Sequence, residues 1–179
     1  SEKYFKNAEK LVRLDFRFRE HIIEEVEKHY SEYLKDKPVS ILVRDFNPEY
    51  DYPNCENNHI NIPSEFYEKS IDILGKDRTY IICSNNIEQT KKQKVFQGDN
   101  FIFNEVVPDD IYKGHFDLCL MSMCQDFIIS NSTFAWWGAW LGKGEGKRVL
   151  IPTPWYGPGL SHISTDDLYP DEWEKIEWK

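Results

Sequence analysis

Asp126-Phe-Ile-Ile-Ser-Asn-Ser-Thr-Phe-Ala-Trp-Trp-Gly-Ala-Trp-Leu141 is the stretch of sequence that decides the fold. Residues 127–129 form a short apolar run typical of a buried strand. Residues 133–141 are apolar over a length that suits a helix, and Gly142 follows as a stop signal. Four polar residues, 130–133, separate the two parts. The stretch therefore predicts a strand, a tight polar turn and a helix in direct succession.

The same pattern of short apolar runs occurs elsewhere along the chain. Further strands are predicted at residues 39–43, 80–83, 101–103 and 149–151, and helices at about 64–74, 87–96, 115–124 and 133–141. Alternation of strand and helix is typical of right-handed crossovers and of a parallel sheet covered by helices. We therefore predict an α/β fold, with a doubly wound, mostly parallel, Rossmann-like sheet that carries helices on both faces.

Two amphipathic helices are predicted ahead of the first strand. Each places its apolar residues on one helical face, the first with Tyr4, Phe5, Ala8, Leu11 and Val12, the second with Ile22, Ile23, Val26, Tyr30 and Tyr33. The period changes after Lys37 and Pro38. We expect residues 1–37 to pack on, or lead into, a nucleotide-binding domain of residues 38–179.

The composition favours one compact core and opposes polyanionic partners. A chain of 179 residues buries roughly 70 % of its unfolded surface, and aromatic residues make up 15 % of this one. Thirty-one acidic against twenty-two basic residues give a formal charge of −9, a field that opposes nucleic acid and anionic membranes. Any anionic ligand must therefore be held by a local group of cations or N–H donors.

Four cysteines, Cys55, Cys83, Cys119 and Cys124, have neither the spacing of a zinc site nor the density of a disulfide-stapled secreted module. They are interpreted as reduced thiols. The longest apolar region is interrupted by the polar residues 130–133 and so does not span a bilayer, and no signal peptide is recognised. We expect a cytoplasmic location.

Polar side chains follow the predicted strands, at the edge where ligands of parallel sheets bind. Arg44 follows the first strand, Ser84, Asn85 and Asn86 follow the second, and Ser130, Asn131, Ser132 and Thr133 follow the fourth. A helix start with Ser and Thr hydroxyls holds a phosphate well, and an Arg side chain clamps a pyrophosphate with two hydrogen bonds. These residues are the candidate site for a phosphorylated ligand.

Structural interpretations stand beside these functional ones. Ser132 or Asn131 can be an ordinary helix cap, and Arg44 can form an ion pair with Asp45 or another surface acid. The tryptophans of residues 136–140 lie on a helix that is apolar on nearly every side, which favours core packing. The histidines have no metal-ligand spacing, and no Ser-His-Asp order or Walker-type glycine loop is visible. We assign no metal, no cofactor and no covalent nucleophile.

The segment Ser-Asn-Ser-Thr-Phe-Ala-Trp-Trp-Gly-Ala-Trp-Leu, residues 130–141, resembles the signature of the bacterial α-1,2-fucosyltransferases, glycosyltransferase family eleven. The flanks agree, at residues 1–5, 117–122, 151–155 and 167–173. The resemblance implies the carboxy-terminal, nucleotide-binding half of an inverting enzyme that needs no metal. Such an enzyme transfers fucose from GDP-β-L-fucose to the 2-hydroxyl of a galactoside in surface-polysaccharide or lipopolysaccharide assembly, in peripheral association with the membrane-bound machinery.

The resemblance also assigns roles. Arg44 and the turn at 130–133 would stabilise the negative charge that grows on the GDP β-phosphate as fucose leaves. Members of the family open with a Gly-Gly-Leu-Gly-Asn-Gln segment of an acceptor-side domain, and that segment does not occur here. We therefore expect this chain alone to bind the donor nucleotide and to be inactive without the remaining domain. A general base for the acceptor hydroxyl is also expected, and no residue of this sequence is assigned to it.

Two departures from the family pattern bear on the donor. The family's His-x-Arg-Arg-x-Asp corresponds here to Leu42-Val-Arg-Asp-Phe-Asn47, in which Arg44 matches the first Arg; a second alignment keeps Asp45 as the motif's Asp instead. The family's Ser-Asp-Asp corresponds to Ser84-Asn85-Asn86. A carboxamide accepts a hydrogen bond from one N–H group of guanine, whereas a carboxylate accepts from two, so an Asn residue facing the base would hold guanine less tightly or favour another base. The alternative is that both Asn residues simply cap the following helix.

Two rival functions remain open. The first is a family relative whose altered pocket takes another nucleotide sugar. The second is a non-catalytic carbohydrate-binding or interaction module, in which Arg44 forms a structural ion pair and the tryptophans only pack.

Overall fold

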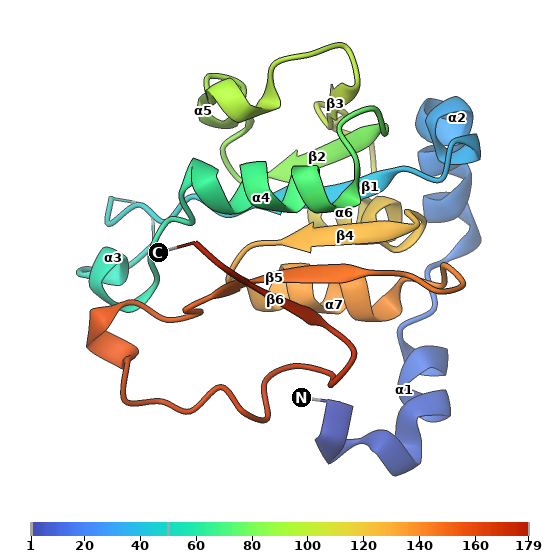
Figure 1. Cartoon of the computed structure of the whole chain (residues 1–179). Coiled ribbons are helices and arrows are strands. Elements are labelled where there is room, and N and C mark those ends of the chain that lie inside the picture. The colour runs from blue at the N-terminus through green and yellow to red at the C-terminus, as the bar shows by residue number, and fades with distance from the viewer. Residues whose placement is uncertain (1, 50, 179) are drawn as a thin grey trace.

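The computed structural model describes residues 2–49 and 51–178, except for the side chain of Glu56. A six-stranded sheet forms its centre, in the order β3-β2-β1-β4-β5-β6 (Figure 1). The strands are β1 (Val39–Val43), β2 (Tyr80–Ser84), β3 (Phe101–Phe103), β4 (Asp126–Ile129), β5 (Val149–Thr153) and β6 (Glu174–Glu177). Every neighbouring pair is parallel. The predicted doubly wound sheet is confirmed.

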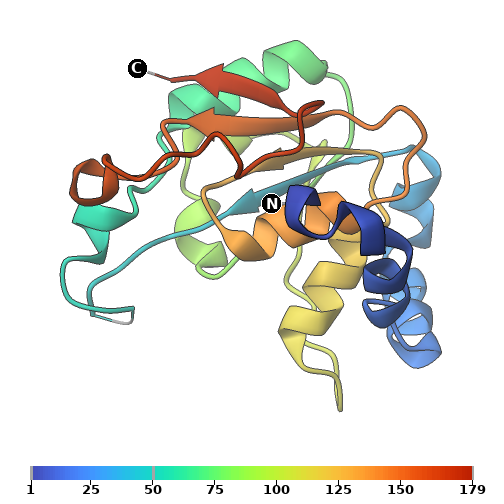
Figure 2. The same ribbon diagram turned by 90° about the horizontal axis from the view of Figure 1, so that it is seen from below.

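Helices connect the strands and cover both faces of the sheet. The α-helices are α1 (Glu9–Asp15), α2 (Glu20–Lys35), α3 (Cys55–Asn58), α4 (Ser64–Leu74), α5 (Ile87–Thr90), α6 (Lys113–Ser122) and α7 (Thr133–Leu141), and the 3-10 turns are Glu2–Tyr4, Lys6–Ala8, Lys94–Phe96 and Pro158–Leu160. Figure 2 shows α4 above the sheet and α2, α6 and α7 below it. The sheet is therefore the middle layer of three.

The strand residues alternate between two hydrophobic clusters, because successive side chains of a strand point to opposite faces. In β1, Val39, Ile41 and Val43 pack in the cluster beneath α4, whereas Leu42 packs in the cluster of α2, α6 and α7. Ile128 in β4 packs in the same cluster as Val39, Ile41 and Val43. Both faces are apolar, which explains why the strands appear in the sequence as continuous apolar runs.

The first predicted helix differs from the structure. Residues 2–15 form two 3-10 turns and the short helix α1, and none of these elements buries a residue. Tyr4 and Leu11, two members of the expected apolar face, are 80 % and 64 % exposed. Phe5 is the residue that anchors this segment, since its ring lies 5.8 Å from Trp137 and 5.2 Å from Trp140.

Other boundaries also differ. The helix expected at 87–96 is the single turn α5 followed by a 3-10 turn at Lys94–Phe96. The strand β6 was not predicted, because its sequence Glu-Lys-Ile-Glu contains one apolar residue and its burial alternates at the edge of the sheet. The second predicted helix is present as α2, which buries Ile22, Val26 and Tyr30.

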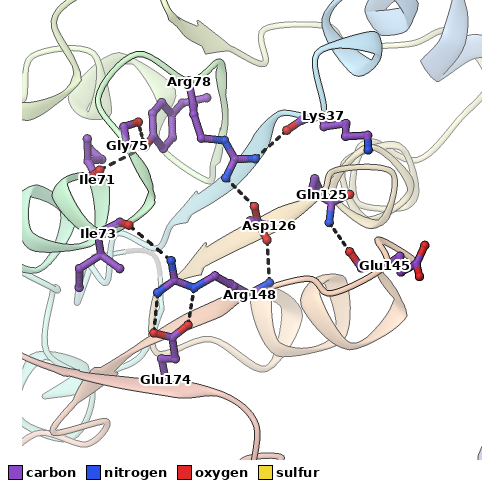
Figure 3. A network of polar contacts seen from close by, with 11 residues as sticks. Lys37, Ile71, Ile73, Gly75, Arg78, Gln125, Asp126, Glu145, Arg148 and Glu174 are labelled. Atoms are coloured by element: carbon purple, nitrogen blue, oxygen red, sulfur yellow. Dashed lines mark hydrogen bonds and ion pairs between the residues drawn. The ribbon is translucent and has the colours of Figure 1, made fainter.

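A polar network ties the amino ends of the central strands together (Figure 3). The Asp126 carboxylate, 9 % exposed, accepts a hydrogen bond of 2.5 Å from the Arg78 guanidinium and one of 2.6 Å from the backbone N–H of Arg148. Arg148 in turn donates two hydrogen bonds of 2.7 Å to Glu174. The network thus joins β4 to the loop before β2, to β5 and to the edge strand β6.

Candidate functional site

A pocket of about 380 Å³ opens at the carboxyl ends of β1 and β2, beside the first turns of α6 and α7. This is the edge at which open parallel sheets bind ligands. Its lining combines two cations with hydroxyl and amide groups, namely Leu42, Val43, Arg44, Ser84, Asn85, Tyr112, Lys113, Gly114, Asp117, Ser132 and Phe134. The pocket brings together Arg44, Ser84, Asn85 and Ser132, four of the eight residues that the sequence predicts for the site.

Arg44 is held in place by the loop that follows β1. Its guanidinium forms an ion pair with Asp51 and lies 4.8 Å above the ring of Phe46. The other carboxylate oxygen of Asp51 accepts a hydrogen bond of 2.9 Å from the backbone N–H of Asn47. The expected alternative, an ion pair of Arg44 with a nearby acid, therefore exists, with Asp51 as the partner. A guanidinium has five N–H donors, so this ion pair leaves donors for a ligand.

Asn85 and Asn86 direct their amides to Asp45. The Asn85 side chain accepts a hydrogen bond of 2.8 Å from the backbone N–H of Asp45 and donates one of 2.8 Å to its carbonyl. Asn86 donates to the Asp45 carboxylate at 2.7 Å and caps α5 by accepting from the N–H of Gln89 at 3.3 Å. Asn86 is thus a helix cap, as one interpretation expected, whereas Asn85 joins the ends of β1 and β2.

Ser84 supports the same turn. Its hydroxyl oxygen accepts hydrogen bonds from the backbone N–H of Asn86 at 3.0 Å and from the hydroxyl of Thr90 at 2.9 Å. Ser84 therefore holds the wall of the pocket in shape with these two hydrogen bonds.

The four residues of the signature turn point in different directions. Ser130 and Asn131 are buried, and the Asn131 amide donates hydrogen bonds of 3.0 and 3.1 Å to the carbonyls of Ile60 and Trp155. Ser132 lines the pocket and is the N-cap of α7, accepting from the N–H of Ala135 at 3.5 Å. Thr133 lines a separate apolar pocket of about 120 Å³ beside Trp137. The start of α7 thus reaches the larger pocket through Ser132.

Lys113 and Asp117, which the sequence interpretation did not include in the site, add a charged pair. The Lys113 ammonium lies 2.8 Å from the Asp117 carboxylate, four residues further along α6. Asn104 donates to the same carboxylate at 2.6 Å and accepts from the Tyr30 hydroxyl at 2.7 Å. Burial raises the pKa of Asp117 above its ordinary value, while Lys113 and Asn104 oppose that rise. The chain of bonds fixes Lys113 at the rim of the pocket.

The pocket therefore carries the groups that a diphosphate needs. Arg44 and Lys113 supply positive charge, and the N-terminus of α7 supplies the positive end of a helix dipole. Leu42 is 6 % exposed and contributes an apolar part of the lining.

Among the residues that the structure describes, no group of three or more His, Cys, Asp or Glu side chains is arranged to hold a metal ion. No helix within the described ranges combines the length and the apolar character required to cross a bilayer.

Comparison with known proteins identifies relatives by sequence. The model of glycosyl transferase family 11 matches residues 8–177. An Escherichia coli protein named O-antigen biosynthesis glycosyltransferase WbnK is 31 % identical over 119 residues, which cover 64 % of this chain and 38 % of that protein. The Escherichia coli alpha-1,2-colitosyltransferase is 34 % identical over 119 residues, which cover 63 % of this chain and 38 % of that protein.

Solved structures agree on the fold. POFUT1 in complex with GDP-fucose superimposes with a TM-score of 0.50 at 12 % identity, covering 75 % of this chain and 47 % of that one. A family 9 glycosyl transferase from Veillonella parvula gives a TM-score of 0.50 at 14 % identity, covering 90 % and 41 %. At such identities the likeness concerns the fold alone.

Proposed function

Because this chain belongs to glycosyl transferase family 11, whose model matches residues 8–177, we propose that it holds the donor-nucleotide site of a glycosyltransferase. The whole protein transfers fucose from GDP-β-L-fucose to the 2-hydroxyl of a galactoside, with inversion and without a metal. The similarity to a protein named for O-antigen biosynthesis supports a role in bacterial surface-glycan assembly. The chain spans 38 % of the length of these curated relatives, so the proposed activity is that of the whole protein.

The observation that carries this proposal is the pocket at the carboxyl ends of β1 and β2. It places Arg44, Lys113 and the N-terminus of α7 around one space of about 380 Å³. In the transfer, the bond between the sugar C1 and the β-phosphate oxygen breaks while a bond from the acceptor oxygen to C1 forms. The acceptor proton passes to a base, and the electron pair of the broken bond stays on the diphosphate.

Catalysis by these residues is electrostatic. Negative charge grows on the β-phosphate as the sugar leaves, and cations already aimed at that oxygen lower the barrier without having to reorganise. Arg44 is held by Asp51 and Phe46, and Lys113 by Asp117, so both arrive preorganised. Asp117 already binds Lys113 and Asn104, which makes it a positioning residue and a poor candidate for the base.

A second donor is favoured by two observations. Asn85 and Asn86 stand where the family pattern has two Asp residues, and both form hydrogen bonds with Asp45. They therefore offer no carboxylate to a guanine base. One of the relatives is named for the transfer of colitose, a different sugar. The alternative is therefore a transferase of the same family that takes another nucleotide-linked sugar at this pocket.

Calorimetric titration with GDP, GDP-fucose, UDP and ADP, with and without EDTA, tests the proposal. We expect GDP-containing ligands to bind selectively and EDTA to have no effect. Loss of one charge-assisted contact of about 1.5–3 kcal/mol in Arg44→Ala or Lys113→Met weakens binding about 10- to 100-fold. The matched controls, Arg19→Ala and Lys94→Met, change exposed cations outside the pocket and should bind normally.

The outcomes separate the alternatives. If another nucleotide bound more tightly than GDP, the donor in the proposal would be a sugar linked to that nucleotide instead of GDP-fucose. Unchanged affinity in both pocket variants would remove Arg44 and Lys113 from the phosphate site. If the full-length protein bound none of the four nucleotides, the donor-site proposal would be refuted.

A further inference from the structure

A second and larger pocket lies at the opposite end of the sheet. It measures about 950 Å³ and is bordered by the residues that precede β1, β4 and β5. Its lining is mainly apolar between the basic side chains, with Phe16, Phe18, Ile23, Leu34, Met123 and Leu141 from the loop after α1, α2, the turn after α6, and α7. A space of this size takes an organic molecule of several hundred daltons.

The charge of this pocket is opposite to that of the chain. Its charged lining residues are all cations, namely Arg13, Arg17, Lys37, Lys143 and Lys147, and no described residue in the lining is Asp or Glu. The chain as a whole has a formal charge of −9. Five cations on one concave, mainly apolar surface of an acidic protein create a local positive potential. We therefore expect the ligand of this pocket to carry negative charge.

Two of the five cations are tied to α7, and Arg17 donates a local hydrogen bond of 3.2 Å to the carbonyl of Leu14. Arg13 pairs with Glu9 at 2.8 Å and donates to the carbonyl of Trp140 at 3.0 Å. Lys147 is half-buried and donates hydrogen bonds of 2.7, 3.1 and 2.8 Å to three carbonyls at the end of α7. These two side chains shape the pocket, and they leave the capture of an anion to the other three.

Arg17, Lys37 and Lys143 are exposed at the rim of the pocket. Within the described ranges, none of these three side chains forms an ion pair with a carboxylate. The same end of the molecule exposes Leu14 to 50 %, next to the lining residues of α1. A ligand that fits must therefore offer an anionic group to the rim and an apolar part to the floor.

We propose that this pocket binds an anionic phospholipid of a bilayer, with the headgroup phosphate at Arg17, Lys37 and Lys143 and the first part of an acyl chain on the apolar floor. A strand of five residues spans about 16 Å, so the lipid site and the donor pocket lie at opposite ends of the sheet. The protein can therefore rest on a membrane by one end while its donor pocket stays open to solvent.

Co-sedimentation of the full-length protein with vesicles tests the inference. One set of vesicles is pure phosphatidylcholine and the other contains phosphatidylglycerol. We expect binding to the anionic vesicles, and a loss of about ten-fold or more in Lys37→Glu/Lys143→Glu, because each basic residue near an anionic surface adds attraction. Arg17→Glu is a second, independent variant in case the first fails to fold, as judged by circular dichroism.

Lys92→Glu/Lys94→Glu is the matched control, since it changes the net charge equally at exposed lysines outside the pocket. We expect this control to bind as the parent does. Equal binding to both kinds of vesicle, or an equal loss in the control, would overturn the proposal. Glycerol phosphate added in solution should compete poorly, because it lacks the apolar part; full competition would indicate a soluble phosphate ligand instead and would also refute it.

Nucleotide titration of the same variants keeps the two sites distinct. Lys37→Glu/Lys143→Glu should bind the donor nucleotide as the parent does. If the parent protein failed to bind anionic vesicles while it bound the nucleotide, the lipid site alone would be rejected and the donor-site proposal would stand.

Discussion

Replacement of Arg78 by Met tests the polar network that joins the central strands. The side chain keeps its approximate length but loses its charge, so the Asp126 carboxylate retains the backbone N–H of Arg148 and loses its cation. Asp126 begins β4, between β1 and β5, and its carboxylate is 9 % exposed. An unpaired carboxylate at this position is poorly hydrated and should destabilise the folded state.

The expected magnitude follows from this burial. Removing one partner of a buried pair costs about 3–5 kcal/mol, and the partial exposure of Arg78, 28 %, favours the lower end of that range. For a chain of this size, a loss of about 3 kcal/mol lowers the melting temperature by roughly 6–12 °C. Lys76→Met is the control, because Lys76 forms a solvent-exposed pair with Asp72 and its loss should barely change the stability.

Urea unfolding followed by circular dichroism measures both variants. Addition of Asp126→Asn to the Arg78 variant should cost less than the sum of the two single changes, since the uncompensated charge is then absent. A loss below about 1 kcal/mol in Arg78→Met, or strict additivity in the double variant, would refute the reasoning that this pair stabilises the centre of the sheet.

Ser132→Ala removes the cap of α7, so the free energy of unfolding measured by urea titration should fall by about 1 kcal/mol. The GDP affinity measured by calorimetry should fall as well. An unchanged affinity would show that Ser132 acts only as a helix cap. Burial raises the pKa of Cys83 and of Cys119 from near 9 to about 12. The unfolded chain therefore loses these protons first, and stability should be constant below pH about 9 and fall as the pH rises toward 12; constant urea midpoints across that range would contradict this. Gly157→Ala would place its Cβ 2.4 Å from the carbonyl oxygen of Asn57, so we expect a lower melting temperature. An unchanged melting temperature would show that the backbone at this contact relaxes easily.

The fold was largely predictable, because five of the six strands are apolar runs and four of these, β1, β2, β4 and β5, are largely buried on both faces. The edge strand β6 escaped prediction because a half-exposed strand needs few apolar residues. The place of the candidate pocket was also predictable, since the carboxyl ends of parallel strands meet at one edge.

The directions of individual side chains were not predictable. Asn131 turns inward because two carbonyls far away in sequence, those of Ile60 and Trp155, accept from its amide. Asn85 binds Asp45, which lies 40 residues earlier. Lys113 was missed because it comes from the first turn of a helix and follows no strand. Contacts of this kind depend on tertiary structure, which no local pattern contains.

The tryptophans of α7 give the molecule an optical property. Trp136, Trp137, Trp140 and Trp173, four of the six in the chain, are linked by ring contacts of 5.1–6.2 Å. At such separations excitation energy passes readily from one indole to the next, so this cluster should dominate the intrinsic fluorescence. The helix that carries three of them begins with Ser132 and Phe134 at the proposed donor pocket. Nucleotide binding at that pocket should therefore change the tryptophan emission, which would make the cluster a spectroscopic reporter that needs no dye.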